Sequence, residues 1–335
     1  MLQALGIAAL SLATLSAVFV ALLVGRRASL ARREQYFAEA EVRLRPVAVG
    51  IVDGEVDELP SLTPADQAIL AEVVGRLSRS LAGDARVRVS RYFESSPALA
   101  HELEAVHSRR VWRRAQAAYR LGDMASAHAV EPLLQALGDD DRDVRAAAAR
   151  SLGRLQVVEA VQPLLLALVS RSVPRVIGFQ AVLDIGPPAL PALRSMLHGE
   201  DARLRAEAVE LIGQLGEASD GEVLVHALSD PSAEVRARVA AALGRLGAAA
   251  GASALREALG DRIYFVRLHA ARALGRLGEP QAVPTLLDQA RGDQFEAARS
   301  AAEALALSDP EALLRAAAAP GAGPHLHEAA DLLRV

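Results

Sequence analysis

The stretch Val235-Arg-Ala-Arg-Val-Ala-Ala-Ala-Leu-Gly-Arg-Leu-Gly247 recurs, with few changes, at other places in the chain. Close copies begin at Val144 and Val266, and a looser copy begins at Leu204. Self-similarity at a fixed period is the signature of a repeat architecture, in which each unit buries its apolar face against its neighbours. We therefore expect the fold of this protein to follow from the repeat unit.

Arginines mark the period, because one stands near the start of the second helix expected in each unit. Successive marker arginines are 30 or 31 residues apart, at Arg114, Arg145, Arg175, Arg205, Arg236 and Arg267. Glycines suited to a left-handed helix end close several units, at Gly186, Gly216, Gly247 and Gly278. Prolines suited to a first helical turn mark the intervening helices, at Pro132, Pro163, Pro191 and Pro284. The spacing therefore predicts a series of helix pairs.

The composition favours an all-α fold. Hydrophobic residues make up 52% of the 335-residue chain and aromatic residues only 3%, and the abundant alanine and leucine are strong helix formers. The absence of cysteine excludes disulfides, thiolate metal sites and cysteine nucleophiles. All 37 basic residues are arginine and asparagine is also absent, which indicates a GC-rich, bacterial genome. The net charge of −4 argues against a general nucleic-acid binder.

The N-terminal segment is apolar. Residues 2–24 carry no charged side chain, and about 20 helical residues cross the hydrocarbon core of a bilayer. Arginines follow at Arg26, Arg27, Arg32 and Arg33, and arginine beside a span is retained in the cytoplasm. We therefore predict a transmembrane anchor over residues 1–25 in the cell (inner) membrane, with the N-terminus outside and the rest of the chain cytoplasmic. A cleaved signal peptide is the alternative, but it would need a basic segment before a shorter apolar run.

Three regions are expected after the anchor. Residues 26–61 have the pattern of a basic juxtamembrane helix, which Pro46 ends or kinks, followed by an acidic linker. Residues 62–95 are expected to form capping helices, because the end of a repeat array has a face that no neighbour covers. Residues 96–335 are expected to form the repeat array itself.

The repeat unit resembles the HEAT repeat, especially the HEAT-like form first noted in phycobilisome lyases, over about residues 97–318. The resemblance implies an all-α solenoid of about seven to eight helix pairs, here preceded by one transmembrane helix. In that family an aspartate in the turn faces an arginine six residues later, and these pairs form a ladder. The matching pairs are Asp139/Arg145, Asp230/Arg236 and Asp261/Arg267. Gly199 replaces the aspartate before Arg205, and the copy around Arg175 also departs from the pattern, which predicts an interruption of the ladder in the middle of the array.

One face of the second helices is the candidate binding surface. Positions two, five and nine residues after a marker arginine share a helix face, which lines the concave side of HEAT-type solenoids. On two adjacent units this face carries Arg238, Arg245, His269, Arg272 and Arg276, after an acidic step at Glu207 and Glu210. We predict that the basic residues form a docking patch for an acidic or anionic partner segment. The alternative is an ordinary solvated face.

Aromatic residues near the starts of second helices give an independent indication. Trp112, Tyr264 and Phe295 each precede a marker position by two or three residues. Aromatic residues at such positions are suited to anchor an interface. The alternative is that they fill gaps between repeats.

Catalytic motifs are absent from the sequence. It contains no glycine-rich phosphate loop, nucleophile elbow or metalloprotease helix motif. Iron-binding HEAT-like hydroxylases use several His-Glu pairs, whereas this chain has only His101-Glu102 and His327-Glu328, near opposite ends of the array. We therefore predict an interaction protein rather than an enzyme, with no cofactor, no metal site and no small-molecule substrate.

The anchor and the array together predict a membrane-anchored cytoplasmic scaffold that binds a protein partner. The resemblance implies a membrane-associated partner, such as a membrane glycosyltransferase or polysaccharide-synthesis complex, because anchored HEAT-like proteins of this layout are often encoded beside such enzymes. Two alternatives stay open. One is a bilin-lyase-like enzyme or chaperone subunit, although those relatives are soluble. The other is a nucleic-acid-binding HEAT array, which the acidic net charge opposes.

Overall fold

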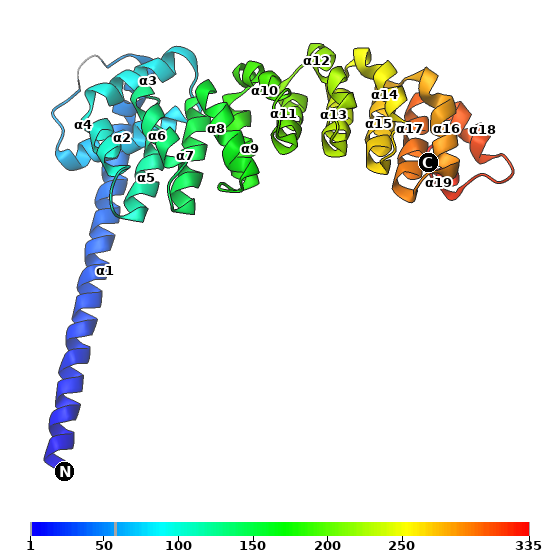
Figure 1. Cartoon of the computed structure of the whole chain (residues 1–335). Helices are drawn as coiled ribbons and strands as arrows, with labels where there is room; N and C mark the ends of the chain where they lie inside the picture. The colour runs from blue at the N-terminus through cyan, green and yellow to red at the C-terminus, as the bar shows by residue number, and fades with distance from the viewer. Residues whose placement is uncertain (1, 57–58, 335) are drawn as a thin grey trace. The chain divides into compact units, whose positions relative to one another are not determined.

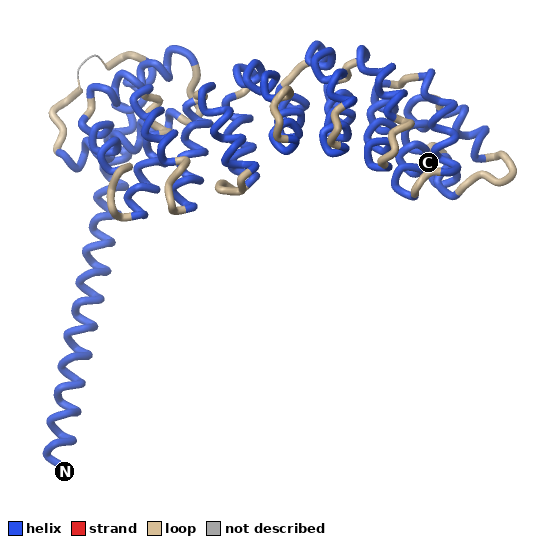
Figure 2. The backbone as a smooth tube through the Cα atoms, in the orientation of Figure 1, coloured by secondary structure: helices blue, strands red, loops and turns tan. Residues whose placement is uncertain are grey.

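The computed structural model describes the backbone of residues 2–56 and 59–334, and their side chains except those of residues 2–18 and 33. The described residues form α-helices joined by turns and short 3-10 segments, and no strand occurs among them (Figure 2). The prediction of an all-α fold is confirmed. The helices belong to two compact units: the first runs to Glu104 and includes Asp123–Ala127, and the second contains the rest.

The first unit contains α1 (Leu2–Asp53), α2 (Pro64–Ser78), α3 (Gly83–Ser95) and most of α4 (Pro97–Ala105). The C-terminal part of α1 packs against α2 and α3 and buries Leu44 and Ala48. The helix runs through Pro46 to Asp53, so it does not end at this proline. Pro46 is exposed, and burial of the apolar residues around it outweighs the backbone hydrogen bond that proline cannot donate.

The predicted anchor coincides with the N-terminal part of α1, and the side chains of residues 2–18 lie outside the described ones. From residue 19 the helix exposes large apolar side chains, including Phe19 at 61% and Leu22 at 66%. No single helix is long and apolar enough to cross a membrane within the residues that the structure describes. One bent pair, Arg175–Ile185 with Pro187–Met196 at 100°, meets the requirements of length and composition.

The second unit is a series of helix pairs. The second helices are α5 (Val111–Leu121), α7 (Arg142–Leu155), α9 (Arg175–Ile185), α11 (Ala202–Leu215), α13 (Ala233–Leu246), α15 (Tyr264–Leu277) and α17 (Phe295–Ser308). The first helices are α6 (Val130–Ala136), α8 (Val161–Val169), α10 (Leu190–Met196), α12 (Gly221–Val225), α14 (Ala252–Ala258) and α16 (Val283–Gly292). A last pair, α18 (Pro310–Ala317) and α19 (Pro324–Leu332), closes the series. Figure 1 shows α5 to α17 as one row, in which neighbours pack side by side. The predicted helix pairs are thus present.

The residue seven positions after a marker arginine lies in the core of its pair and is leucine in most pairs, with Val182 and Ile212 in α9 and α11. Leu152, Leu243 and Leu274 have no exposed surface. The helix ends follow the glycine pattern only in part. Gly247 and Gly278 adopt the left-handed conformation at φ 63° and 64°, whereas Gly216 is extended at φ −81°. At the end of α7 a non-glycine residue, Gln156, takes the left-handed conformation.

Glycines set the distance between neighbouring second helices. The glycine eight residues after a marker arginine faces a small residue of the next helix, as Gly153 faces Ala181 and Gly244 faces Ala273. A Cβ atom at Gly153 or Gly244 would lie 2.7 Å from the neighbouring alanine Cα atom. Gly122, Gly213 and Gly275 make the same kind of approach. Each of these helix contacts therefore requires glycine, because any side chain would push the helices apart.

The α9–α11 junction departs from this rule. Leu183 stands where α5, α7, α11, α13 and α15 have the facing glycine, and Leu211 stands where the next helix has its small residue. Among neighbouring second helices, α9 and α11 are the least closely packed. Val176 on α9 is 80% exposed. Two bulky side chains thus replace the close glycine contact at this one place in the row.

Candidate interaction surface

The marker arginines link each repeat to the next. The Nε and Nη2 atoms of Arg236 donate to both carboxylate oxygens of Asp261, at 2.7 and 3.1 Å, and Nη1 donates to the backbone carbonyl of Asp230 at 2.8 Å. The side chain of Asp230 accepts instead from the N–H of Ser232, which is the N-cap residue of α13 and makes no side-chain capping hydrogen bond. Asp230 and Arg236 thus meet across the turn, as the resemblance implies, but through the carbonyl of Asp230 and not through its carboxylate. The spacing of six residues identifies a contact with the carbonyl, and the carboxylate partner lies in the following repeat.

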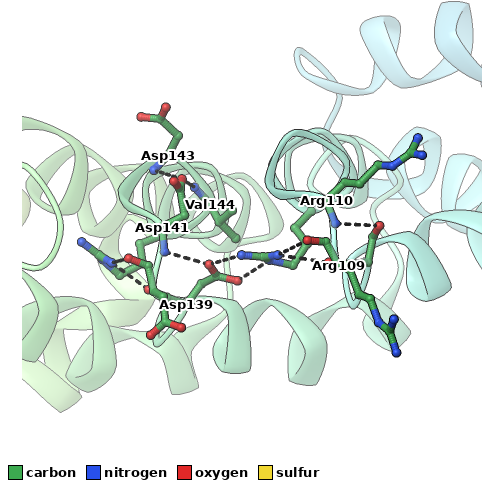
Figure 3. A network of polar contacts seen from close by, with 10 residues as sticks. Arg109, Arg110, Asp139, Asp141, Asp143 and Val144 are labelled. Carbon is green, nitrogen blue, oxygen red and sulfur yellow. Dashed lines mark hydrogen bonds and ion pairs between the residues drawn. The ribbon is translucent and has the colours of Figure 1, made fainter.

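Three other marker arginines repeat this arrangement, which we call a rung. Their aspartate partners lie 25 or 26 residues further along the chain, in the pairs Arg114–Asp139, Arg205–Asp230 and Arg267–Asp293. Figure 3 shows the rung at Asp139 together with the turn before α7. Hydrogen bonds from Arg114 hold the pKa of Asp139 below its usual value, and Arg267 does the same for Asp293. Each of these rungs thus joins an ionised aspartate to the repeat before it.

The ladder is interrupted in the middle of the array, as the sequence predicts. Arg205 keeps a full rung with Asp230. Gly199 stands where the aspartate partner of Arg175 would be. Arg175 pairs with Glu207 of α11 instead, at 2.9 Å. Among the described residues Arg145 has no aspartate partner either, and its Nε donates to the carbonyl of Ser172 at 2.7 Å. The weakened rungs lie directly before and across the α9–α11 junction.

Two residues of the predicted docking patch are already neutralised. Arg238 pairs with Glu207 at 3.1 Å and with Glu234 at 2.8 Å, and its side chain is only 23% exposed. Arg245 pairs with Glu210 at 3.1 Å. Burial raises the pKa of Glu210, but the charge and hydrogen bond of Arg245 lower it further, so that it lies below the ordinary value. The acidic step is therefore the counter-charge of these arginines and not a separate feature of the surface.

Arg272 and Arg276 differ from this pair. Both lie on the exposed face of α15, four residues apart, and within the described residues neither has a carboxylate at ion-pair distance. His269, one turn earlier, is half-buried, and burial together with the charge of Arg272 lowers its pKa. The imidazole is therefore neutral at pH 7 and adds no positive charge. The free positive charge of the predicted patch is concentrated on Arg272 and Arg276.

The three aromatic residues lie at helix starts and are all exposed, Trp112 at 59%, Tyr264 at 38% and Phe295 at 62%. Tyr264 and Phe295 begin the neighbouring helices α15 and α17. Phe295 contacts the ring of His325 edge-on, with 4.6 Å between ring centroids. Trp112 lies on α5, several repeats away, so the three rings do not form one surface. Whether any of them binds a partner stays a prediction.

One charged segment was not predicted from the sequence. Arg109, Arg110 and Arg113 are exposed beside Trp112, before and within the first turn of α5. The sequence signal for this segment is the run of arginines around the single tryptophan, which lies outside the helix-face positions used to predict the docking patch. In the described part of the chain, no group of three or more His, Asp or Glu side chains is arranged to hold a metal ion.

Several solved structures are similar to this chain. Human deoxyhypusine hydroxylase in complex with glycerol is 21% identical, with 82% of this chain and 98% of that chain covered and a TM-score of 0.33. The complex of CpcE and CpcF of phycocyanin lyase from a Nostoc species is 22% identical, covering 76% and 96%, with a TM-score of 0.30. YibA of Escherichia coli is 18% identical, covering 78% and 96%, with a TM-score of 0.37. No curated protein matches the sequence significantly.

The family model for HEAT repeats matches residues 97–183 and 221–306, together just over half of the chain. The first match ends at Leu183, and the gap between the two matches contains α10 and α11. The family pattern is therefore lost where the glycine contact and the aspartate rung are both missing. The helix pairs, the rungs and the sequence match agree that this chain belongs to the HEAT-repeat family.

Proposed function

We propose that this protein is a membrane-anchored scaffold, rather than an enzyme, whose HEAT solenoid holds a partner protein at the cytoplasmic face of the membrane. HEAT solenoids present long surfaces suited to protein binding. The anchor rests on the uncharged residues 2–24 and on the arginines that follow them. The apolar side chains that α1 exposes from Phe19 to Val24 support it, because such a surface is unfavourable in water.

The observation that carries the binding role is the free charge of Arg272 and Arg276. Most of the marker arginines, and Arg238 and Arg245, already have carboxylate partners within the chain. Two arginines one turn apart on the same helix face can pair with carboxylates of a partner, and guanidinium groups do so through two hydrogen bonds each. The partner segment is accordingly acidic. The resemblance of the anchored layout directs the search first to membrane glycosyltransferases and polysaccharide-synthesis complexes.

The test is affinity capture from solubilised membranes with the full chain as bait. The substitutions Arg272→Glu and Arg276→Glu should remove a set of captured proteins that the unmodified chain retains. The matched control is Arg291→Glu with Arg315→Glu, which makes the same change of net charge on the first helices α16 and α18. Reversing Arg245 is unsuitable, because it would place a second carboxylate beside Glu210 and disturb packing between α11 and α13.

The captured set is then identified by mass spectrometry, and its strongest member is purified and mixed with the bait. We expect direct binding that weakens as salt is raised, because exposed charges are screened beyond about 8–10 Å at physiological ionic strength. Capture that is equally strong with the Arg272/Arg276 variant, or equally weak with the Arg291/Arg315 control, would reject this surface as the binding site.

A further inference from the structure

A basic and aromatic segment lies exposed at the start of α5. Its five consecutive residues, Arg109, Arg110, Val111, Trp112 and Arg113, are all exposed, and we call them the α5 edge. The Arg113 guanidinium lies 5.6 Å from the centroid of the Trp112 ring, in cation–π range. Within the described residues no carboxylate pairs with the three arginines. Tryptophan and arginine are the residues that most often anchor protein interfaces.

The α5 edge is held in place by the rung beneath it. The Nη1 atom of Arg114 donates to the carbonyl of Ser108 at 3.1 Å, while its other nitrogens hold Asp139 at 2.7 and 2.9 Å. The hydroxyl of Ser108 accepts from the N–H of Arg110 at 3.3 Å. Figure 3 shows the side chains of Arg109 and Arg110 extending away from this network. The backbone that carries Arg109 and Arg110 is therefore held in place, while their side chains extend into solvent.

An acidic segment occupies the neighbouring repeat. Asp140 and Asp143 are exposed at the start of α7, and we call this pair the α7 edge. The Asp143 carboxylate, 77% exposed, lies 3.6 Å from Arg142 and points away from the network in Figure 3. The intervening Asp141 is occupied, because its carboxylate accepts the N–H groups of Asp143 and Val144 at the start of the helix. Exposed negative charge thus lies one repeat away from exposed positive charge.

The two edges make one surface that is complementary to itself. The Arg114–Asp139 rung joins the two turns directly, so the two edges of opposite charge lie on turns that are held together. A two-fold rotation of such a surface places each positive edge opposite the negative edge of the other copy, as a two-fold interface requires. We propose that two copies of this chain associate through the α5 and α7 edges, with Val111 and Trp112 buried between them. This inference does not depend on the proposed scaffold function.

A second copy fits this surface better than an anionic partner does. A membrane of anionic lipids, or an acidic peptide, would be attracted to the α5 edge but repelled by Asp140 and Asp143 beside it. Like charges placed together at an interface are strongly unfavourable. In a pair of copies the α5 edge of each faces the α7 edge of the other, so both edges meet opposite charge.

The test uses charge reversal and mixing with the full chain purified in detergent, at low ionic strength. One variant carries Arg109→Asp and Arg110→Asp, and the other carries Asp140→Arg and Asp143→Arg. None of the four side chains takes part in a rung, so both variants should keep the helical circular dichroism of the unmodified chain. Dimerisation is measured by sedimentation velocity, and exchange between copies by fluorescence transfer between two labels.

Each variant alone should dimerise at least about tenfold more weakly, because like edges then face one another. An equimolar mixture of the two variants should recover a dimer, since both contacts become complementary again. A control with Arg291→Asp and Arg315→Asp should dimerise as the unmodified chain does. The proposal is overturned if the unmodified chain is monomeric, if the single variants dimerise normally, or if mixing restores nothing. It is equally overturned if the chain binds phosphatidylserine vesicles through the α5 edge and does not dimerise.

Discussion

Replacing Asp261 by alanine tests whether the rungs hold the repeats together. The change removes both hydrogen bonds from Arg236 and the acceptor of the Ile263 N–H group, at 2.7, 3.1 and 2.8 Å. The two side chains are only 10% and 12% exposed, so little solvent is present to replace the lost partner. Hydrogen bonds to charged groups contribute about 1.5–3 kcal/mol each, and Arg236 keeps its bonds to two carbonyls. We expect a loss of about 2–4 kcal/mol in the stability of the α13–α15 region.

The assay has to be local, because repeat arrays need not unfold in one step. Hydrogen exchange on the full chain gives the free energy of opening for amides in α13 and α15 separately from those in α5 and α7. The control is Glu311→Ala, which breaks the Arg315–Glu311 pair, whose side chains are 68% and 86% exposed. Such an exposed pair is worth about 0.3–0.5 kcal/mol. If Asp261→Ala changed the opening of α13 and α15 no more than this control does, the rungs would not be a source of stability.

Three further predictions concern the anchor, the rungs and the α9–α11 junction. First, a reporter enzyme fused to the C-terminus should be active only in a form that works in the cytoplasm, and activity of a periplasmic reporter there would contradict the anchor orientation. Second, the rung aspartates Asp139, Asp261 and Asp293 have lowered pKa values in the folded chain. Their contribution to stability is therefore present above the unfolded pKa of about 4 and is lost as the pH falls below it. The thermal midpoint of unfolding should drop in that range, and an unchanged midpoint would argue against the rungs. Third, spin labels can be placed on cysteines that replace Asp184 and Arg276, which lie on either side of the α9–α11 junction. This pair should give a broader distance distribution than labels at Gln214 and Leu307, which lie equally many repeats apart on one side of the junction. Equal widths would show that the junction is as stiff as the others.

The repeat and the core positions could be predicted from the sequence, because both depend on local periodicity. Leu152, Leu243 and Leu274 recur at a fixed distance from a marker arginine, and all three are fully buried. A helix must bury its apolar stripe. The spacing of apolar residues within each helix therefore determines that the helices pair, independently of the neighbouring repeats. The helix does not end at Pro46, because contacts of α1 with α2 and α3 favour its continuation.

The candidate surface depended on contacts between repeats, which the spacing within one unit does not contain. Arg238 and Arg272 hold comparable places in the sequence pattern, yet Arg238 is paired with Glu207 of the preceding helix and Arg272 is free. The carboxylate partner of Arg236 likewise stands 25 residues away rather than six. The sequence by itself determined an all-α array of HEAT-type helix pairs, because helical periodicity is a local property. Only the tertiary structure decided which charges cancel and which remain available, because pairing depends on how closely and in what register neighbouring helices stack.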